Sequence, residues 1–315
     1  MQLPTFKDYL QLHFVVLIWG FTAILGELIS IPSVELVFWR TLIAAAGVFA
    51  LIKLRQRHIP YIEPRELLKM LLTGGLIAAH WILFFAAARI STVSICLVGM
   101  ATCSLWTSLL EPIFHKRKVR PLEIFIGLVI IAGLYQVFAS EFSYALGLVL
   151  AILSAMLGAL FSIMNSKLVR KHAPLHITLY EMVGAFGSTL LFLPFYYFYF
   201  AEGQTLRLAA SPTDWLYIGL LALVCTVYAY AKGVQLMRKF TPFAVNLTVN
   251  LEPVYGIVLA YFIFGEKEKM SADFYLGASI ILLAVLSYPV LDKWLKNRHK
   301  NQDTESQLAA SSSNH

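Results

Sequence analysis

The chain is a succession of apolar stretches of about 20 residues, separated by short polar segments. Stretches of that length cross roughly 30 Å of hydrocarbon when they are helical. The alternating ten-residue segments of a membrane β-barrel are not seen. The pattern predicts ten transmembrane helices, at residues 10–29, 34–53, 67–88, 91–113, 122–139, 145–167, 176–200, 214–236, 243–264 and 273–292. The polar segment after Lys300 is predicted to be disordered.

Composition supports a protein that is surrounded by lipid. Hydrophobic residues make up 59% of the chain and charged residues 14%, against roughly 25% charged residues in soluble domains. The net charge of +7 does not indicate nucleic acid, because the basic residues lie in short loops between apolar stretches. The three cysteines form no CxxC pair, so no disulfide, metal site or cofactor is expected. A primary pump is disfavoured because the chain has no G-x-x-x-x-G-K-[ST] loop.

The distribution of basic residues predicts how the chain is oriented. Most of the 25 Lys and Arg residues lie at the N-terminus, in alternate loops and after the last apolar stretch. Lys and Arg concentrate on the cytoplasmic side of membrane proteins. We therefore expect a multi-pass protein of the cell's inner membrane with both termini in the cytoplasm. The aromatic run at 195–200 would form an outer interfacial belt.

The second half of the chain repeats features of the first at an offset of 150 positions. Residues 113–131 align with residues 263–281, including Gly127 with Gly277. The first hairpin is mainly basic and the second mainly acidic, as expected if the two copies face opposite sides of the membrane. Each copy has five helices, an odd number, so the second must be inverted, a common plan among secondary transporters. The expected architecture is all-α, with repeats at 1–140 and 141–295 and a disordered cytoplasmic tail at 296–315; a duplicated scaffold without transport is the alternative.

With this pattern the chain resembles the EamA-type transporters of the drug/metabolite transporter superfamily over nearly its whole length, up to about residue 295. The residues that carry the resemblance are Trp19-Gly20, Arg40 in "FWRTLIAAAG", Pro253 in "LEPVYG", Gly265-Glu266 and Gly277. The first copy departs from the pattern, since His115-Lys116 replaces Gly-Glu and Cys103 replaces Pro253. The resemblance implies export of amino acids or other metabolites through a central cavity lined by helices 1–4 and 6–9.

Ionisable residues inside apolar stretches usually face a cavity or a partner. Glu27 is a well-placed partner for Arg40 near the outer end of the first two helices. Glu181 and Lys232 share a depth in the cytoplasmic third of the membrane. Either Glu181 balances Lys232, or Lys232 extends its amine to the cytoplasmic interface alone.

Glu252 and Pro253 form the strongest local signal. Proline cannot donate to the helical hydrogen-bond ladder, so the ninth helix should kink or open there. An opened turn in mid-membrane is tolerated only against a cavity or a protein neighbour. Glu252 lies on one polar face, and Asn246 and Asn250 lie on another. The asparagines either line the cavity or hydrogen-bond neighbouring helices.

Several weaker candidates lie near the same depth. His80 could relay a proton, because imidazole titrates near neutral pH, or it could simply pack between helices. Its repeat equivalent is Tyr230. Trp19, Tyr228 and Tyr230 are expected to give apolar contacts to a substrate.

These features predict a secondary transporter that exports a small metabolite by alternating access. Arg40 would hold an anionic group, and Glu252 would meet a cationic group or carry a proton. Charges of both signs suit a zwitterion such as an amino acid. Expected partners are a small-molecule substrate, the lipid bilayer and protons, with the protein a monomer or homodimer. A membrane-embedded enzyme and a scaffold are the alternatives. The substrate-binding candidates are Trp19, Arg40, His80, Glu181, Tyr228, Tyr230, Lys232, Asn246, Asn250 and Glu252.

Overall fold

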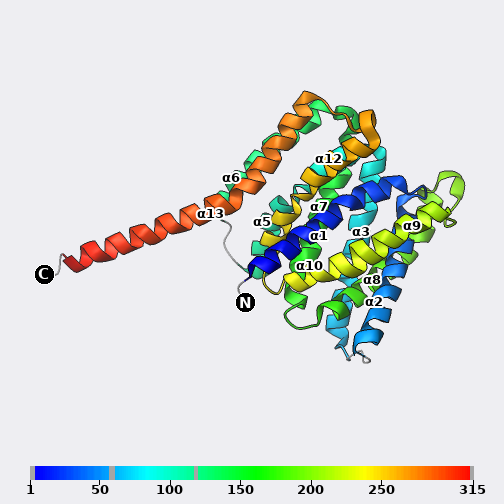
Figure 1. The fold of residues 1–315 in the computed structure, drawn as a ribbon, viewed down its shortest axis with the longest axis horizontal. Coiled ribbons are helices and arrows are strands. Elements are labelled where there is room, and N and C mark those ends of the chain that lie inside the picture. The colour runs from blue at the N-terminus through cyan, green and yellow to red at the C-terminus, as the bar shows by residue number, and fades with distance from the viewer. Residues whose placement is uncertain (1–3, 57–60, 117–119, 313–315) are drawn as a thin grey trace.

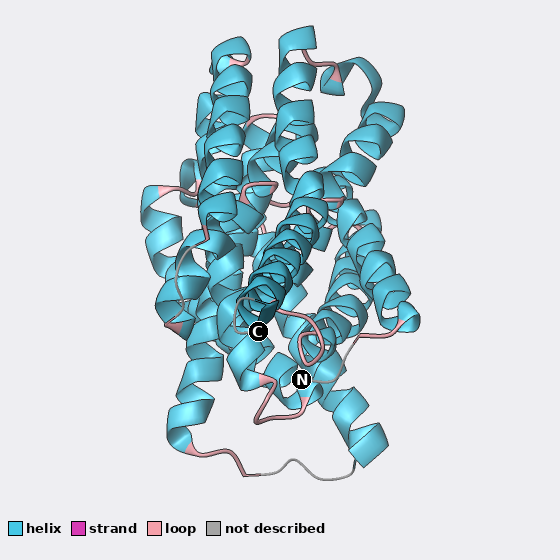
Figure 2. Cartoon of the chain, turned by 90° about the vertical axis from the view of Figure 1, so that its left-hand side faces the viewer, coloured by secondary structure: helices cyan, strands magenta, loops and turns pink. Residues whose placement is uncertain are grey.

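The computed structural model describes residues 4–56, 61–116 and 120–312, and every regular element in these ranges is a helix (Figures 1 and 2). The first half contains α1 (Phe6–Leu28), α2 (Ser33–Gln56), α3 (Pro64–Ile90), α4 (Val93–Met100), α5 (Cys103–His115) and α6 (Pro121–Ser140). The second half contains α7 (Ala145–Leu168), α8 (Pro174–Tyr199), α9 (Pro212–Leu220), the π-helical segment η3 (Leu221–Tyr230), α10 (Ala231–Leu236), α11 (Pro242–Val249), α12 (Glu252–Phe264) and α13 (Ala272–Ser312). Short 3₁₀ turns lie at η1 (Phe142–Tyr144), η2 (Glu202–Gln204) and η4 (Gly265–Glu268).

Nine helical segments in the described ranges are long and apolar enough to cross a membrane. The apolar part of α13, Ala272–Tyr288, is shorter. Prolines begin five of the helices, at Pro64, Pro121, Pro174, Pro212 and Pro242. Proline suits the first helical position because the N–H that it lacks would have no partner there. The predicted all-helical membrane architecture is therefore confirmed at the level of nine to ten spanning-capable helices.

Two of the membrane-spanning segments are broken near their middle. The break between α11 and α12 falls at Asn250 and Leu251, where the sequence predicts that Pro253 opens the helix. A second break, between α4 and α5, falls at Ala101 and Thr102 and was not predicted. No proline is present there; instead the Thr102 hydroxyl donates to the Gly99 carbonyl at 2.7 Å, a local bond that competes with the helical ladder.

A third irregularity is the π-helical turn of η3. The Thr226 hydroxyl donates to the carbonyl of Leu221, five residues earlier, at 2.8 Å. The Cys225 carbonyl accepts a hydrogen bond from Trp19 Nε1 at 3.2 Å. Segments of π-helix occur frequently at functional sites. This hydrogen bond joins η3, in the second half of the chain, to α1, in the first half.

Two glycines set how closely α3 and α8 approach. A Cβ at Gly74 would collide with the backbone of Glu181 and lie 2.7 Å from the amide nitrogen of Ala185. A Cβ at Gly184 would lie 2.6 Å from the Cα of Leu71. The two helices thus meet backbone to backbone, as small residues allow inside membranes.

The last helix differs from the sequence-based expectation. α13 continues to Ser312 and projects away from the bundle (Figure 1), whereas the segment after Lys300 was expected to be disordered. The polar sequence there contains no proline, so nothing in it breaks the hydrogen-bond ladder that begins in the apolar part of the helix.

Candidate functional site

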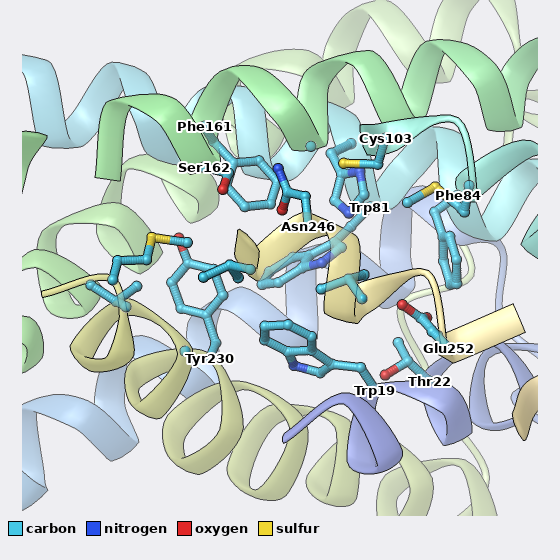
Figure 3. A pocket seen from close by; sticks show the side chains of 18 of the residues that line it. Trp19, Thr22, Trp81, Phe84, Cys103, Phe161, Ser162, Tyr230, Asn246 and Glu252 are labelled. Carbon is cyan, nitrogen blue, oxygen red and sulfur yellow. The ribbon is translucent and has the colours of Figure 1, made fainter. Parts of the chain in front are cut away.

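A cavity of about 90 Å³ lies among the helices of both halves (Figure 3). α1, α2, α3, α4 and α5 line it from the first half, and α7, η3, α10, α11 and α12 line it from the second. Figure 3 shows Glu252 and Thr22 on one side and Tyr230 on the other, with Trp19 between them. The cavity is lined by six of the residues predicted from the sequence: Trp19, Arg40, His80, Tyr230, Asn246 and Glu252.

Arg40 is the cation of this cavity and is only 1% exposed. Its Nε donates to the Thr226 hydroxyl at 3.0 Å, and its guanidinium carbon lies 3.8 Å from the centre of the Trp81 ring. Such stacking attracts a cation to the ring. The Nη1 nitrogen has no protein partner, so Arg40 is held in place with donor capacity to spare.

The predicted partner of Arg40 was wrong. Glu27 instead bonds Lys267 at 2.5 Å, near the ends of α1 and η4. Lys267 belongs to the hairpin of the second half, and the sequence gives no sign of how close that hairpin lies to α1.

Glu252 is the carboxylate of the cavity and is 7% exposed. It is the first residue of α12, where the unpaired N–H groups at the start of a helix favour negative charge. No ion pair joins it to Arg40 or to another described cation. The cavity therefore contains charged groups of opposite sign that do not neutralise each other by direct contact.

The two predicted asparagines have different environments. Asn246 lines the cavity, and its Nδ2 donates to the Thr107 hydroxyl at 2.7 Å, which ties α11 to α5. Asn250 lies in the break between α11 and α12, buried, with neither side-chain polar atom bonded. It is not among the residues that line the cavity.

His80 lines the cavity and is fixed by Ser154. Its Nδ1 lies 2.8 Å from the backbone carbonyl of Ser154, and the Ser154 hydroxyl lies 2.8 Å from the backbone carbonyl of His80. These contacts fit a tautomer with the proton on Nδ1. The ring meets Phe161 edge-on at 5.3 Å between centroids. His80 therefore packs between helices and also lines the cavity, while its role as a proton relay stays a prediction.

Glu181 does not line the cavity, but it is hydrogen-bonded to the hydroxyl of Tyr230, which does. It is fully buried, and its Oε2 accepts a hydrogen bond from the Tyr230 hydroxyl at 2.9 Å. That hydroxyl accepts from Asn165 Nδ2 at 2.7 Å. Asn165 was missed, although a single asparagine in the apolar stretch 145–167 was visible in the sequence.

Of the two alternatives for Lys232, an ion pair with Glu181 is not found among the described residues. Lys232 Nζ instead donates to Gln235 Oε1 at 3.2 Å. Lys232 and Tyr228 both line a separate groove rather than the cavity. Residues two apart on a helix point to nearly opposite sides, so neither Tyr228 nor Lys232 faces the cavity that Tyr230 lines.

Several polar or aromatic residues in or beside the cavity were not among the predicted site residues. Trp81 stacks on Arg40, Thr226 anchors its Nε, and Ser162 contributes a buried hydroxyl without a partner. Trp81 was detectable as the neighbour of His80. Nothing in the sequence distinguishes Thr226 or Ser162 from the many hydroxyl residues that bond back to their own helix.

Comparisons with known proteins agree with this architecture. An uncharacterized transporter, YxxF, from Bacillus subtilis (strain 168) is 22% identical over 274 residues, which cover 84% of this chain and 83% of the relative. A crystal structure of a protein that is 15% identical superposes with a TM-score of 0.65 over 93% of this chain and 99% of its own, which shows a shared fold.

The family match covers both halves. Residues 8–139 and 145–288 each match the family described as EamA-like transporters. The family and the name of the relative point to a transporter rather than an enzyme. The chain is built of apolar helices, each of its two halves matches the family model, and the cavity lies between those halves. The chain therefore belongs to the EamA-like transporter family.

Proposed function

We propose that the protein is a secondary transporter that exports a small zwitterionic metabolite, such as an amino acid, through the central cavity. One observation carries this proposal. The Arg40 guanidinium, with an unpartnered Nη1, and the Glu252 carboxylate line the same cavity without forming an ion pair.

Charges buried without a direct partner are costly. A ligand with a carboxylate for Arg40 and an ammonium for Glu252 would compensate both at once. The aromatic rings of Trp19 and Trp81 would then contact the apolar part of the ligand. This arrangement favours a zwitterion over a simple amine or a simple carboxylate.

The size of the cavity favours a small substrate. Pockets for drug-sized ligands are about 300–1,000 Å³, whereas this cavity is about 90 Å³. Larger substrates would require the surrounding helices to move apart.

The broken helices support alternating access. The breaks at Thr102 and Leu251 lie at corresponding places in the two family-matched halves. Discontinuous helices at the interface of inverted repeats form the substrate sites of many secondary transporters. We propose that the halves are inverted copies and that one rocks against the other around the cavity.

Orientation and coupling are part of the same proposal. The distribution of basic residues favours an orientation with both termini in the cytoplasm, in an inner membrane. Glu252, which contacts the substrate site, would bind a proton in one facing state and release it in the other. Proton entry would then drive export.

Counterflow in proteoliposomes tests this function. Liposomes are loaded in turn with amino acids, amines and carboxylic acids, and uptake of the same radiolabelled compound is followed. We expect a transient accumulation for at least one amino acid and none in liposomes without protein. Counterflow of amines or carboxylic acids alone would contradict the zwitterion, and its absence for every compound would contradict transport of small metabolites.

A further inference from the structure

A second hollow, separate from the central cavity, lies where α2 ends and α8 begins. This basic groove has a volume of about 570 Å³ and is bounded by α1, α2, α8, η3 and α10. Its cations are Arg55, Lys232 and Arg238. Among the described residues, no acidic side chain lines it.

None of these three cations has a carboxylate partner among the described residues. Lys232 bonds the neutral amide of Gln235. Arg238 donates from Nε to the carbonyl of Val169 at 3.2 Å and from Nη2 to the carbonyl of His172 at 3.1 Å. These carbonyls fix the guanidinium in position without removing its charge.

Carboxylates at this end of the bundle are engaged elsewhere. Asp8 pairs with Lys239 at 2.8 Å. Glu66 pairs with Lys69 at 2.6 Å and with Lys171 at 3.5 Å. The positive charge of the basic groove therefore remains uncompensated by the described protein groups.

The start of α8 adds to this positive field. Pro174 and Leu175, its first two residues, line the basic groove. The first N–H groups of a helix have no partner within it and carry partial positive charge. An anion in the groove would thus meet three cationic side chains and the N-terminal end of a 26-residue helix.

Apart from Gln11 and Gln235, the remaining wall of the basic groove is mainly apolar. Leu51, Val227 and Tyr228 line it, and Tyr228 is 50% exposed. A soluble anion would leave this surface unused. A molecule with an anionic head and a hydrocarbon tail would cover the cations and the apolar wall together.

We infer that the basic groove binds an anionic phospholipid, with the phosphate between Arg55, Lys232 and Arg238 and the acyl chain along Leu51 and Tyr228. Basic pockets between membrane helices are suited to such headgroups. The site is separate from the transport cavity, so this inference does not depend on the identity of the transported substrate.

Short-chain lipids provide the direct test. Dioctanoyl-phosphatidylglycerol is titrated into the purified full-length protein in an uncharged detergent, and binding is followed by isothermal calorimetry. We expect saturable binding, with much weaker binding of dioctanoyl-phosphatidylcholine and of glycerol 3-phosphate. Equal binding of phosphatidylcholine would overturn the headgroup assignment. Equal binding of glycerol 3-phosphate would overturn the lipid and leave a site for a free phosphate ester.

A matched pair of triple variants localises the site. Arg55→Gln/Lys232→Gln/Arg238→Gln removes the three groove cations, whereas Lys7→Gln/Lys53→Gln/Arg65→Gln removes three exposed cations that do not line the groove. At about 1 kcal/mol per cation, the first variant should weaken phosphatidylglycerol binding roughly a hundredfold, and the second should change it less than threefold. Equal losses in the two variants would show general surface attraction and overturn the groove. If a variant fails to fold, the comparison of headgroups in the wild-type protein still tests whether the protein prefers an anionic phospholipid.

Discussion

Substitution of Arg40 by methionine removes the guanidinium while retaining most of the side-chain volume. The structure sets the size of the expected effect. Nε is occupied by Thr226, and Nη1 is free, so a substrate carboxylate would gain about one charge-assisted hydrogen bond there. Such a bond contributes about 1.5–3 kcal/mol, which corresponds to roughly 10–150-fold in the dissociation constant.

The assay is equilibrium binding of the substrate found by counterflow, measured on detergent-solubilised protein. Arg40→Lys keeps the charge but loses the planar stacking on Trp81 and the Nε bond, so we expect an intermediate loss. Thr226→Val keeps the guanidinium and removes only its anchor, so its effect should be smaller than that of Arg40→Met. If Arg40→Met binds within twofold of wild type while its melting temperature is unchanged, Arg40 does not hold the substrate.

Three further predictions follow from the same geometry. Glu252→Gln should abolish net proton-linked transport but retain part of the homo-exchange, measured side by side in proteoliposomes; wild-type net transport in this variant would exclude Glu252 from coupling. Gly184→Ala should lower stability by about 1–3 kcal/mol, because its Cβ would meet the α3 backbone, whereas Gly187→Ala, with nothing within 4 Å, should not; thermal melts in detergent compare the two, and equal melting temperatures would refute the backbone contact. An impermeant thiol reagent applied to intact cells should label Glu202→Cys and not Arg65→Cys, against a background in which the three native cysteines are buried; the reverse result would invert the proposed topology.

The helices and one of the two breaks were predictable because their signals are local. Apolar length marks a membrane helix, and proline at 253 marks the break before α12. The break at Thr102 has no such mark in the sequence; the threonine hydroxyl there bonds backward along the helix. Hydroxyl residues elsewhere make similar bonds, such as Thr73 to the carbonyl of Lys69, without any break in the helix.

Part of the candidate site was also predictable, but from polar residues in apolar stretches rather than from the length of those stretches or from proline. Arg40, Glu252 and Asn246 were found because polar residues at mid-membrane are costly and usually face a cavity. Lys232 and Tyr228 were misplaced because depth alone does not determine which side of a helix a residue faces. Glu181 was considered as a partner of Lys232 on shared depth alone, whereas it accepts a hydrogen bond from Tyr230.

The π-helical turn of η3 has a consequence for how this chain diverges from its relatives. The turn holds more residues per revolution than the helices on either side, so loss of one residue between Leu221 and Tyr230 would convert it to ordinary α-helix without shortening the span appreciably. Such a deletion would leave the helices on either side of the turn facing as before, because the change from π-helix to α-helix takes up the rotation of about a hundred degrees that the lost residue would cause in an ordinary α-helix. Among homologues, a single-residue gap should therefore be tolerated between Leu221 and Tyr230 but not in the α-helices that flank this segment.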